Sequence, residues 1–328
     1  MATAACAIVE DRVEDTLHRE FRQDVLTGLS QPRKAIPARW FYDHRGSELF
    51  EAITRLPEYY PTRTEIGILA SASAEIAATV GKRRVVVEFG AGSATKTPLL
   101  LDAIAPAGYV PIDISGAFLE ESCDALRRRY PGLPIHPVTA DFNEPARIPA
   151  ALAHHVRLGF FPGSTIGNME PLAAADLLRV MRATLGSGSM LLIGMDRIKA
   201  RGVLVEAYDD AQGVTAAFNL NLLRRINREL AGSIPVEAFR HRAVWNDERA
   251  RIEMHLEAVR DMHMEVAGTR FTMSAGETIH TENSHKYEPR GATTLLLAGG
   301  WEPCRIWSDP EGQFMVILAQ ALGSDLTA

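Results

Sequence analysis

Segments typical of buried strands and segments typical of helices alternate along the middle of this chain. We predict strands at 84–89, 109–114, 135–139, 156–163 and 189–196. Helices are predicted between them at 95–104, 116–129 and 170–185. Alternation at this spacing is typical of a parallel sheet, because each helix carries the chain back to the edge where the previous strand began. The middle of the chain is therefore predicted to be a doubly wound α/β fold.

The two ends of the chain follow other patterns. Before the alternating part we predict a helix at 10–30, a proline-broken loop at 31–43, a short helix at 46–56 and a helix at 63–79. After it we predict a helical segment at 203–230, antiparallel strands within 249–266 and 269–282, a helix at 288–299 and a final hairpin around 309–312. These segments predict an insertion that splits the α/β domain.

The first predicted strand runs into a glycine turn, VEFGAGSATK, at 87–96. Gly90 and Gly92 allow the backbone to come close to a ligand. A turn that binds NAD uses a third glycine for close packing of the helix on the strand, and Thr95 stands at that position. The two glycines can also form an ordinary turn between a strand and a helix, so this motif alone does not select a cofactor.

Acidic residues at the ends of the next two predicted strands narrow the choice of cofactor. Asp113 can accept hydrogen bonds from both ribose hydroxyls, and Asp141 can accept the adenine amino group beside the apolar ring of Phe142. Ligands of such sheets bind at the carboxyl ends of the strands. Either aspartate alone can cap a loop, but together with Glu88 and the glycine turn they favour S-adenosylmethionine over NAD. Lys96 either reaches the cofactor carboxylate or is solvated.

Residues that can bind the second substrate follow the fourth predicted strand, in the stretch GFFPGSTIGN at 159–168. The amide of Asn168 both donates and accepts hydrogen bonds, which suits the ammonium and carboxylate of an amino acid. Asn168 can equally be the N-cap of the helix that follows. Tyr59, which lies between two prolines, and Tyr208 are each compatible with packing or with substrate contact.

The bulk properties exclude several classes of partner. The net charge is -6 among 328 residues, which gives no electrostatic basis for binding nucleic acid or an anionic membrane. The amino-terminal segment has no pattern of a signal peptide, and no stretch has the roughly 20 apolar residues of a transmembrane helix. Three scattered cysteines and ten histidines show neither a disulfide framework nor a zinc motif. We expect a cytoplasmic monomer that binds a small molecule and no metal.

Six stretches of the chain resemble the histidine-specific methyltransferases of ergothioneine biosynthesis. They are RWFYDHRGSELFEAITRLPEYYPTRTE, VEFGAGSATKT, FFPGSTIGN, YDDAQGVTAAFN, RIEMHLEA and TENSHKY. The resemblance covers nearly the whole chain and implies trimethylation of the α-amine of L-histidine to hercynine, with S-adenosylmethionine as the methyl donor. The same family includes fungal N-methyltransferases that act on tryptophan derivatives, so another amino acid or aromatic amine stays open as the acceptor.

The resemblance also implies a fold and a set of contacts. The fold is a class I, Rossmann-like methyltransferase core at 61–199 and 286–328, with a smaller α+β lid domain for the substrate at 1–60 and 200–285. The implied cofactor contacts are Gly90, Lys96, Asp113, Asp141 and Phe142. The implied substrate contacts are Tyr59, Gly163, Asn168, Tyr208, Met254, Glu282, Asn283 and Ser284.

Within this set, the resemblance implies that Glu282 and Ser284 meet the imidazole, with Met254 packed beside it. We predict that Tyr59 orients the reacting amine, with Tyr42 as a second candidate. A methyltransferase fold that has lost its activity and an NAD-dependent oxidoreductase are the competing hypotheses. The first would require lost cofactor residues, and the positions named above retain theirs.

Overall fold

The computed structural model describes residues 2–323, which divide into two compact units. The large unit comprises Phe50–Ala207, Trp245–Ile252 and Asn283–Ala328. The small unit comprises Met1–Leu49, Tyr208–Val244 and Glu253–Glu282. Each unit is described by itself below.

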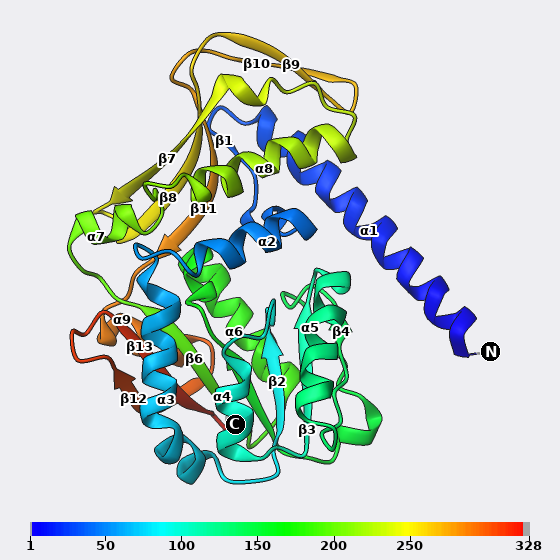
Figure 1. Cartoon of the computed structure of the whole chain (residues 1–328), viewed down its shortest axis with the longest axis vertical. Helices are drawn as coiled ribbons and strands as arrows, with labels where there is room; N and C mark the ends of the chain where they lie inside the picture. The colour runs from blue at the N-terminus through cyan, green and yellow to red at the C-terminus, as the bar shows by residue number, and fades with distance from the viewer. Residues whose placement is uncertain (1, 324–328) are drawn as a thin grey trace, which may run out of the picture. The chain divides into compact units, whose positions relative to one another are not determined.

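The large unit contains a seven-stranded sheet with the strand order β12-β13-β6-β5-β2-β3-β4 (Figure 1). Its strands are β2 (Val85–Phe89), β3 (Gly108–Asp113), β4 (Val138–Thr139), β5 (Arg157–Phe161), β6 (Met190–Asp196), β12 (Trp301–Ser308) and β13 (Phe314–Ala321). Neighbouring strands from β6 through β4 run parallel, whereas β13 is antiparallel to both β6 and β12. The predicted alternation and the predicted closing hairpin are both confirmed.

Helices cover both faces of this sheet. They are α3 (Tyr60–Val80), α4 (Thr97–Ile104), α5 (Gly116–Arg129), α6 (Pro171–Leu185) and α9 (Pro289–Ala298). The large unit also contains α7 (Arg201–Glu206) and the short 3-10 turns η2 (Ala150–Leu152) and η3 (Thr165–Asn168). On β2, Val86 packs in the cluster that contains residues of α3, α4 and α5, whereas Val85 and Val87 pack in the cluster that contains residues of α6 and α9. Burial on both faces explains the unbroken run of valines.

The small unit contains a four-stranded sheet, β1-β11-β8-β7, and a separate antiparallel hairpin of β9 and β10. The strands are β1 (Lys34–Ala35), β7 (Phe239–Asn246), β8 (Arg251–Ala258), β9 (Met262–Val266), β10 (Thr269–Met273) and β11 (Thr278–His285). The helices are α1 (Ala2–Ser30), η1 (Ala38–Phe41), α2 (His44–Ile53), α8 (Val214–Glu229) and η4 (Val236–Ala238). Helix α2 and strands β7, β8 and β11 each continue from one unit into the other.

Four features of the structure differ from the sequence predictions. The segment predicted as a loop at 31–43 holds β1 and η1, because Trp40 and Phe41 are buried and anchor it. The helix predicted at 203–230 is interrupted between α7 and α8, where the carboxylate of Asp210 accepts the backbone N–H groups of Val214 and Thr215. Strand β7 was not predicted, and α3 begins at Tyr60 rather than at residue 63.

Candidate active site

The turn after β2 has the geometry that its glycines allow. Gly90 and Gly92 have φ values of 70° and 51°, which residues other than glycine rarely adopt. The N–H of Gly90 donates to the carbonyl of Ile112 on the neighbouring strand, at 2.8 Å. A Cβ atom on Gly90 would lie 3.4 Å from the ring of Phe142. The turn from β2 and the segment after β4 are therefore in contact at the carboxyl end of the sheet.

Asp113, the last residue of β3, holds this turn in place. Its carboxylate accepts the N–H of Gly92 at 2.9 Å and the N–H of Ser115 at 2.9 Å. Burial raises the pKa of Asp113, and the two backbone hydrogen bonds oppose that rise. A carboxylate has about four acceptor positions, so Asp113 can accept a further hydrogen bond, for example from a ribose hydroxyl. The structure thus brings Asp113 together with the glycine turn, as the sequence predicts.

Asp141 and Phe142 lie in the segment after β4. The carboxylate of Asp141 accepts the backbone N–H of Asn143 at 2.9 Å and its side-chain N–H at 2.6 Å, which folds the segment into a tight turn. The ring of Phe142 packs edge-on against Phe161, with ring centroids 5.8 Å apart. Phe142 is therefore fixed between β5 and Gly90, where it can form one wall of a cofactor site.

Glu88 belongs to the interior of the sheet and not to the predicted ligand set. Its side chain accepts hydrogen bonds from the hydroxyls of Thr97 at 2.7 Å and Tyr109 at 2.6 Å. Burial raises the pKa of Glu88 to about 7. The hydrogen bonds from the two hydroxyls and the charge of nearby Lys96 act in the opposite direction and lower this pKa. These contacts tie β2 to β3 and to the first turn of α4, so Glu88 supports the glycine turn from behind.

The raised pKa of Glu88 predicts how stability depends on pH. A carboxyl whose pKa is higher in the folded state stabilises the fold most at pH values below its unfolded pKa of 4.5. That stabilisation is lost as the pH rises toward 7. Between pH 4.5 and 7.5 the free energy of unfolding of the wild type should therefore fall by up to about 3 kcal/mol relative to that of Glu88→Gln. Denaturant unfolding of both proteins across this range measures the difference. Parallel pH profiles would show that Glu88 does not titrate there.

Lys96 is paired with a buried carboxylate that the sequence analysis did not identify. Its ammonium lies 2.5 Å from Oε2 of Glu65 on α3, and the same oxygen accepts the N–H of Gly163 at 2.8 Å. Glu65 is 1% exposed, and no hydrogen bond reaches its Oε1 from the described residues. An ammonium has three donors, so Lys96 keeps donors for the carboxylate of a cofactor. Solvation alone, one of the two predicted alternatives for Lys96, is wrong.

Asn168 is the last residue of η3 and not the N-cap of α6, where Glu170 stands instead. The capping alternative for Asn168 is therefore wrong. The turn before it packs closely on the end of β11, since a Cβ atom on Gly167 would lie 2.8 Å from the carbonyl oxygen of His285. This contact brings the segment that carries Asn168 next to the segment that carries Ser284.

The remaining predicted substrate residues are divided between the two units. Tyr59, Gly163, Asn168, Asn283 and Ser284 belong to the large unit, and Tyr42, Tyr208, Met254 and Glu282 belong to the small unit. Their assembly into one site and the lid role of the small unit stay predictions.

The local contacts of three of these side chains are defined. Tyr59 is 7% exposed, and its ring packs edge-on against Phe50. Tyr42 packs edge-on against Phe218. Glu282 is 8% exposed on β11, two residues before Ser284. These residues are therefore held by the packing of the elements that carry them.

One cluster of side chains on the small unit has the composition of a metal site. Glu253 and His255 on β8 and His280 on β11 each place a ligand atom within 4.8 Å of the others. Nε2 of His280 donates to the carbonyl oxygen of Glu282 at 2.9 Å, which leaves Nδ1 as its ligand atom. Nε2 of His255 lies 3.4 Å from Oε2 of Glu253, which is near the spacing of about 3.3 Å between ligand atoms of tetrahedral zinc.

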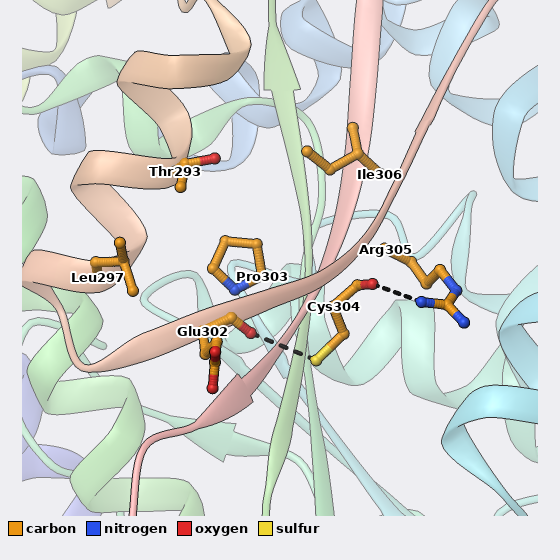
Figure 2. Close-up of a pocket in the computed structure, with 7 residues that line it drawn as sticks. All are labelled: Thr293, Leu297, Glu302, Pro303, Cys304, Arg305 and Ile306. Atoms are coloured by element: carbon orange, nitrogen blue, oxygen red, sulfur yellow. Dashed lines mark hydrogen bonds between the residues drawn. The ribbon is translucent and has the colours of Figure 1, made fainter.

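A surface hollow of about 400 Å³ lies between α9 and β12 (Figure 2). Its lining residues are Thr293, Leu297, Glu302, Pro303, Cys304, Arg305 and Ile306. Strand β12 is the edge strand at the far side of the sheet from β3 and β4, so this hollow is not the predicted cofactor site.

The strand order, the antiparallel β13 and the glycine turn braced by Asp113 together define the class: a methyltransferase with a Rossmann-like core. The model of one family, described as histidine-specific and SAM-dependent methyltransferases, matches residues 21–321. The chain therefore belongs to the family of histidine-specific, S-adenosylmethionine-dependent methyltransferases, and S-adenosylmethionine is its methyl donor.

Relatives with curated names agree with this family. The histidine N-alpha-methyltransferase of Mycolicibacterium smegmatis is 44% identical over 93% of this chain and 96% of its own length. The protein of the same name from Mycobacterium tuberculosis is 42% identical over 93% of this chain and 96% of its own length. A 4-dimethylallyltryptophan N-methyltransferase of Claviceps fusiformis is 27% identical over 95% of each chain.

Proposed function

We propose that the enzyme transfers three methyl groups from S-adenosylmethionine to the α-amine of L-histidine and so forms hercynine, the first step of ergothioneine biosynthesis. The observation that carries the proposal is the similarity over 93% of the chain to two histidine N-alpha-methyltransferases. The cofactor side of the site supports it, because Gly90, Asp113 and Phe142 lie together at the carboxyl end of the sheet.

The reaction is an in-line displacement at the sulfonium methyl group. The enzyme must present a neutral amine on the axis of the breaking bond, and near-attack positioning can supply several kcal/mol of the barrier reduction. We propose that Tyr59 and Asn168 hold the amino-acid backbone and that Tyr59 orients the amine, with Tyr42 as the alternative. A tyrosine hydroxyl or ring face also tolerates the cation that grows over three transfers.

We place the imidazole at the end of the site away from the reacting amine. Glu282 accepts its N–H, Met254 packs beside it, and Tyr208 contacts the amino-acid backbone. Gly163 and Asn283 complete the proposed contacts. The side chain of Asn283 supports a polar role, because its Oδ1 is buried and no described residue donates a hydrogen bond to it.

The acceptor is tested by incubating the enzyme with S-adenosylmethionine and each of the twenty common amino acids, followed by mass spectrometry. Histidine should gain the mass of three methyl groups. The competing acceptor is tryptophan or another aromatic amine, which the similarity to the Claviceps fusiformis enzyme favours. Methylation of tryptophan without histidine would support that alternative, and no methylation at all would support a binding module.

We further propose that the reaction needs no metal, because the leaving thioether is already activated by its positive charge. Dialysis against a strong chelator should leave kcat/KM for histidine within about twofold of its starting value. Steady-state assays before and after dialysis measure this. A large loss that added Zn²⁺ restores would contradict the proposal and point to the cluster of Glu253, His255 and His280.

The described residues contain no helix long and apolar enough to cross a membrane. We propose that the enzyme works as a monomer on a free amino acid in the cytoplasm, without nucleic acid or membrane partners. Its net charge of -6 is consistent with this. Light scattering tests the monomer, with a mass of 36.0 kDa expected.

A further inference from the structure

The carboxylate of Glu65 on α3 joins two turns at the carboxyl end of the large sheet. Its Oε2 atom accepts a hydrogen bond from the ammonium of Lys96 at 2.5 Å and another from the backbone N–H of Gly163 at 2.8 Å. Lys96 follows β2 and Gly163 follows β5, and these two strands are neighbours in the sheet. Glu65 therefore holds together the turn that carries a proposed cofactor contact and the turn that carries a proposed substrate contact.

Strand β6 leaves space for this carboxylate. Gly194 interrupts the apolar run of β6, and a Cβ atom there would lie 1.9 Å from Oε1 of Glu65. Glycine inside a strand weakens the strand and often marks the close approach of another group. Oε1 is buried, and no described residue donates a hydrogen bond to it. The space over Gly194 thus holds the carboxylate with Oε2 toward its two donors.

Lys96 needs an opposite charge at its position. It is the N-cap residue of α4, where the positive end of the helix dipole disfavours a cation. Its side chain is 14% exposed, and its salt-bridge partner among the described residues is Glu65, which is 1% exposed. A buried charge is tolerated only where it is paired and hydrogen-bonded. Glu65 therefore allows an ammonium to stand at this end of the helix and fixes its direction.

The ammonium can still bind an anion. Glu65 takes one of its three N–H donors, and no other residue in the described part of the chain takes a second. A Cβ atom on Gly163 would lie 3.4 Å from Nζ of Lys96, so the missing side chain leaves space beside the ammonium. The amino-acid end of S-adenosylmethionine carries a carboxylate, and a hydrogen bond between two charged groups is about twice as strong as a neutral one.

We propose that Glu65 is a positioning residue that directs the ammonium of Lys96 toward the carboxylate at the amino-acid end of the cofactor. Glu65 acts through Lys96 and does not itself touch the cofactor, because its carboxylate is buried. This inference rests on the cofactor contact of Lys96 in the proposed function, and not on the identity of the methyl acceptor.

The test compares two ligands that share the same nucleoside. S-adenosylhomocysteine carries the amino-acid end, and 5′-methylthioadenosine lacks it. Glu65→Gln should weaken binding of S-adenosylhomocysteine about 10-fold or more, yet change the affinity for 5′-methylthioadenosine less than about twofold. Lys96→Met should do the same. The double variant should lose no more than the larger single loss, because both changes remove one contact. Titration calorimetry measures all affinities.

Two further variants sharpen the comparison. Gly194→Ala fills the space that Oε1 of Glu65 occupies, so it should displace the carboxylate and reproduce the selective loss. Glu75→Gln makes the same chemical change on the same helix, but the exposed side chain of Glu75 pairs with Arg305 and Trp307. It should leave both affinities at their wild-type values.

Each outcome decides. Wild-type affinity for S-adenosylhomocysteine in a folded Glu65→Gln protein, or equal losses for the two ligands, would overturn the inference. If Glu65→Gln does not fold, the double variant, which removes both charges of the pair, is compared with Lys96→Met, and a further loss in the double variant would overturn the inference.

The outcomes also separate this inference from the proposed function. Unchanged affinity for S-adenosylhomocysteine in Lys96→Met would remove the proposed cofactor contact of Lys96 and the inference with it. A selective loss confined to Lys96→Met would contradict only the role of Glu65. Failure of histidine as the acceptor would be recognised in the methylation assay and would leave all these affinities as they are.

Discussion

Glu282→Ala is expected to lower kcat/KM for histidine by about 10- to 100-fold or more. The variant leaves an imidazole N–H without its acceptor in a buried position, since Glu282 is 8% exposed. The activity with tryptophan relative to that with histidine should rise, because tryptophan depends less on this carboxylate. Steady-state kinetics with both amino acids measure the shift.

The control for this prediction is cofactor affinity. Glu282 lies on β11, whereas Gly90 and Asp113, the residues that we propose bind the cofactor, lie at the ends of β2 and β3. Binding of S-adenosylhomocysteine should therefore be the same in the variant and the wild type. An unchanged preference for histidine over tryptophan would show that Glu282 does not determine specificity.

Asp113→Ala should weaken binding of S-adenosylhomocysteine more than it weakens binding of histidine. The change removes the proposed acceptor for the ribose hydroxyls and also the carboxylate that accepts the N–H of Gly92. Each lost hydrogen bond to a buried group costs about 1–3 kcal/mol, so the affinity should fall by about 10- to 100-fold or more. Titration calorimetry measures both ligands.

Asp141→Ala provides a graded comparison. Both aspartates are half-buried, but only the carboxylate of Asp113 also holds the glycine turn, so Asp141→Ala should weaken cofactor binding less than Asp113→Ala does. Unchanged affinity for S-adenosylhomocysteine in both variants would overturn the assignment of these residues to the cofactor.

The parts of the fold and site that follow from local sequence could be predicted. Strand β2, the turn at Gly90 and Gly92, and Asp113 at the end of β3 are each marked by a short pattern that ends where the strand ends. Parallel strands then bring their carboxyl ends together, which explains why the glycine turn and Asp113 could be predicted to lie at one edge of the sheet.

Other features could not be predicted because they depend on residues far apart in the chain. Glu65 pairs with Lys96 across 31 positions, and Lys286 meets Asp196 from a different element altogether. No local pattern distinguishes these buried carboxylates from solvated ones. Strand β7 was missed because three polar residues in a row, Arg240, His241 and Arg242, hide its alternation, and the buried His241 stands where an apolar residue is expected.

The direct measurement of the central claim is the number and position of methyl groups on the product. The enzyme is supplied with histidine and excess S-adenosylmethionine, and the product is fragmented in a mass spectrometer. The product is expected to carry three methyl groups, all on the α-nitrogen, with the imidazole unmodified. Methylation of a ring nitrogen, or a reaction that stops after one transfer on the α-nitrogen, would contradict it.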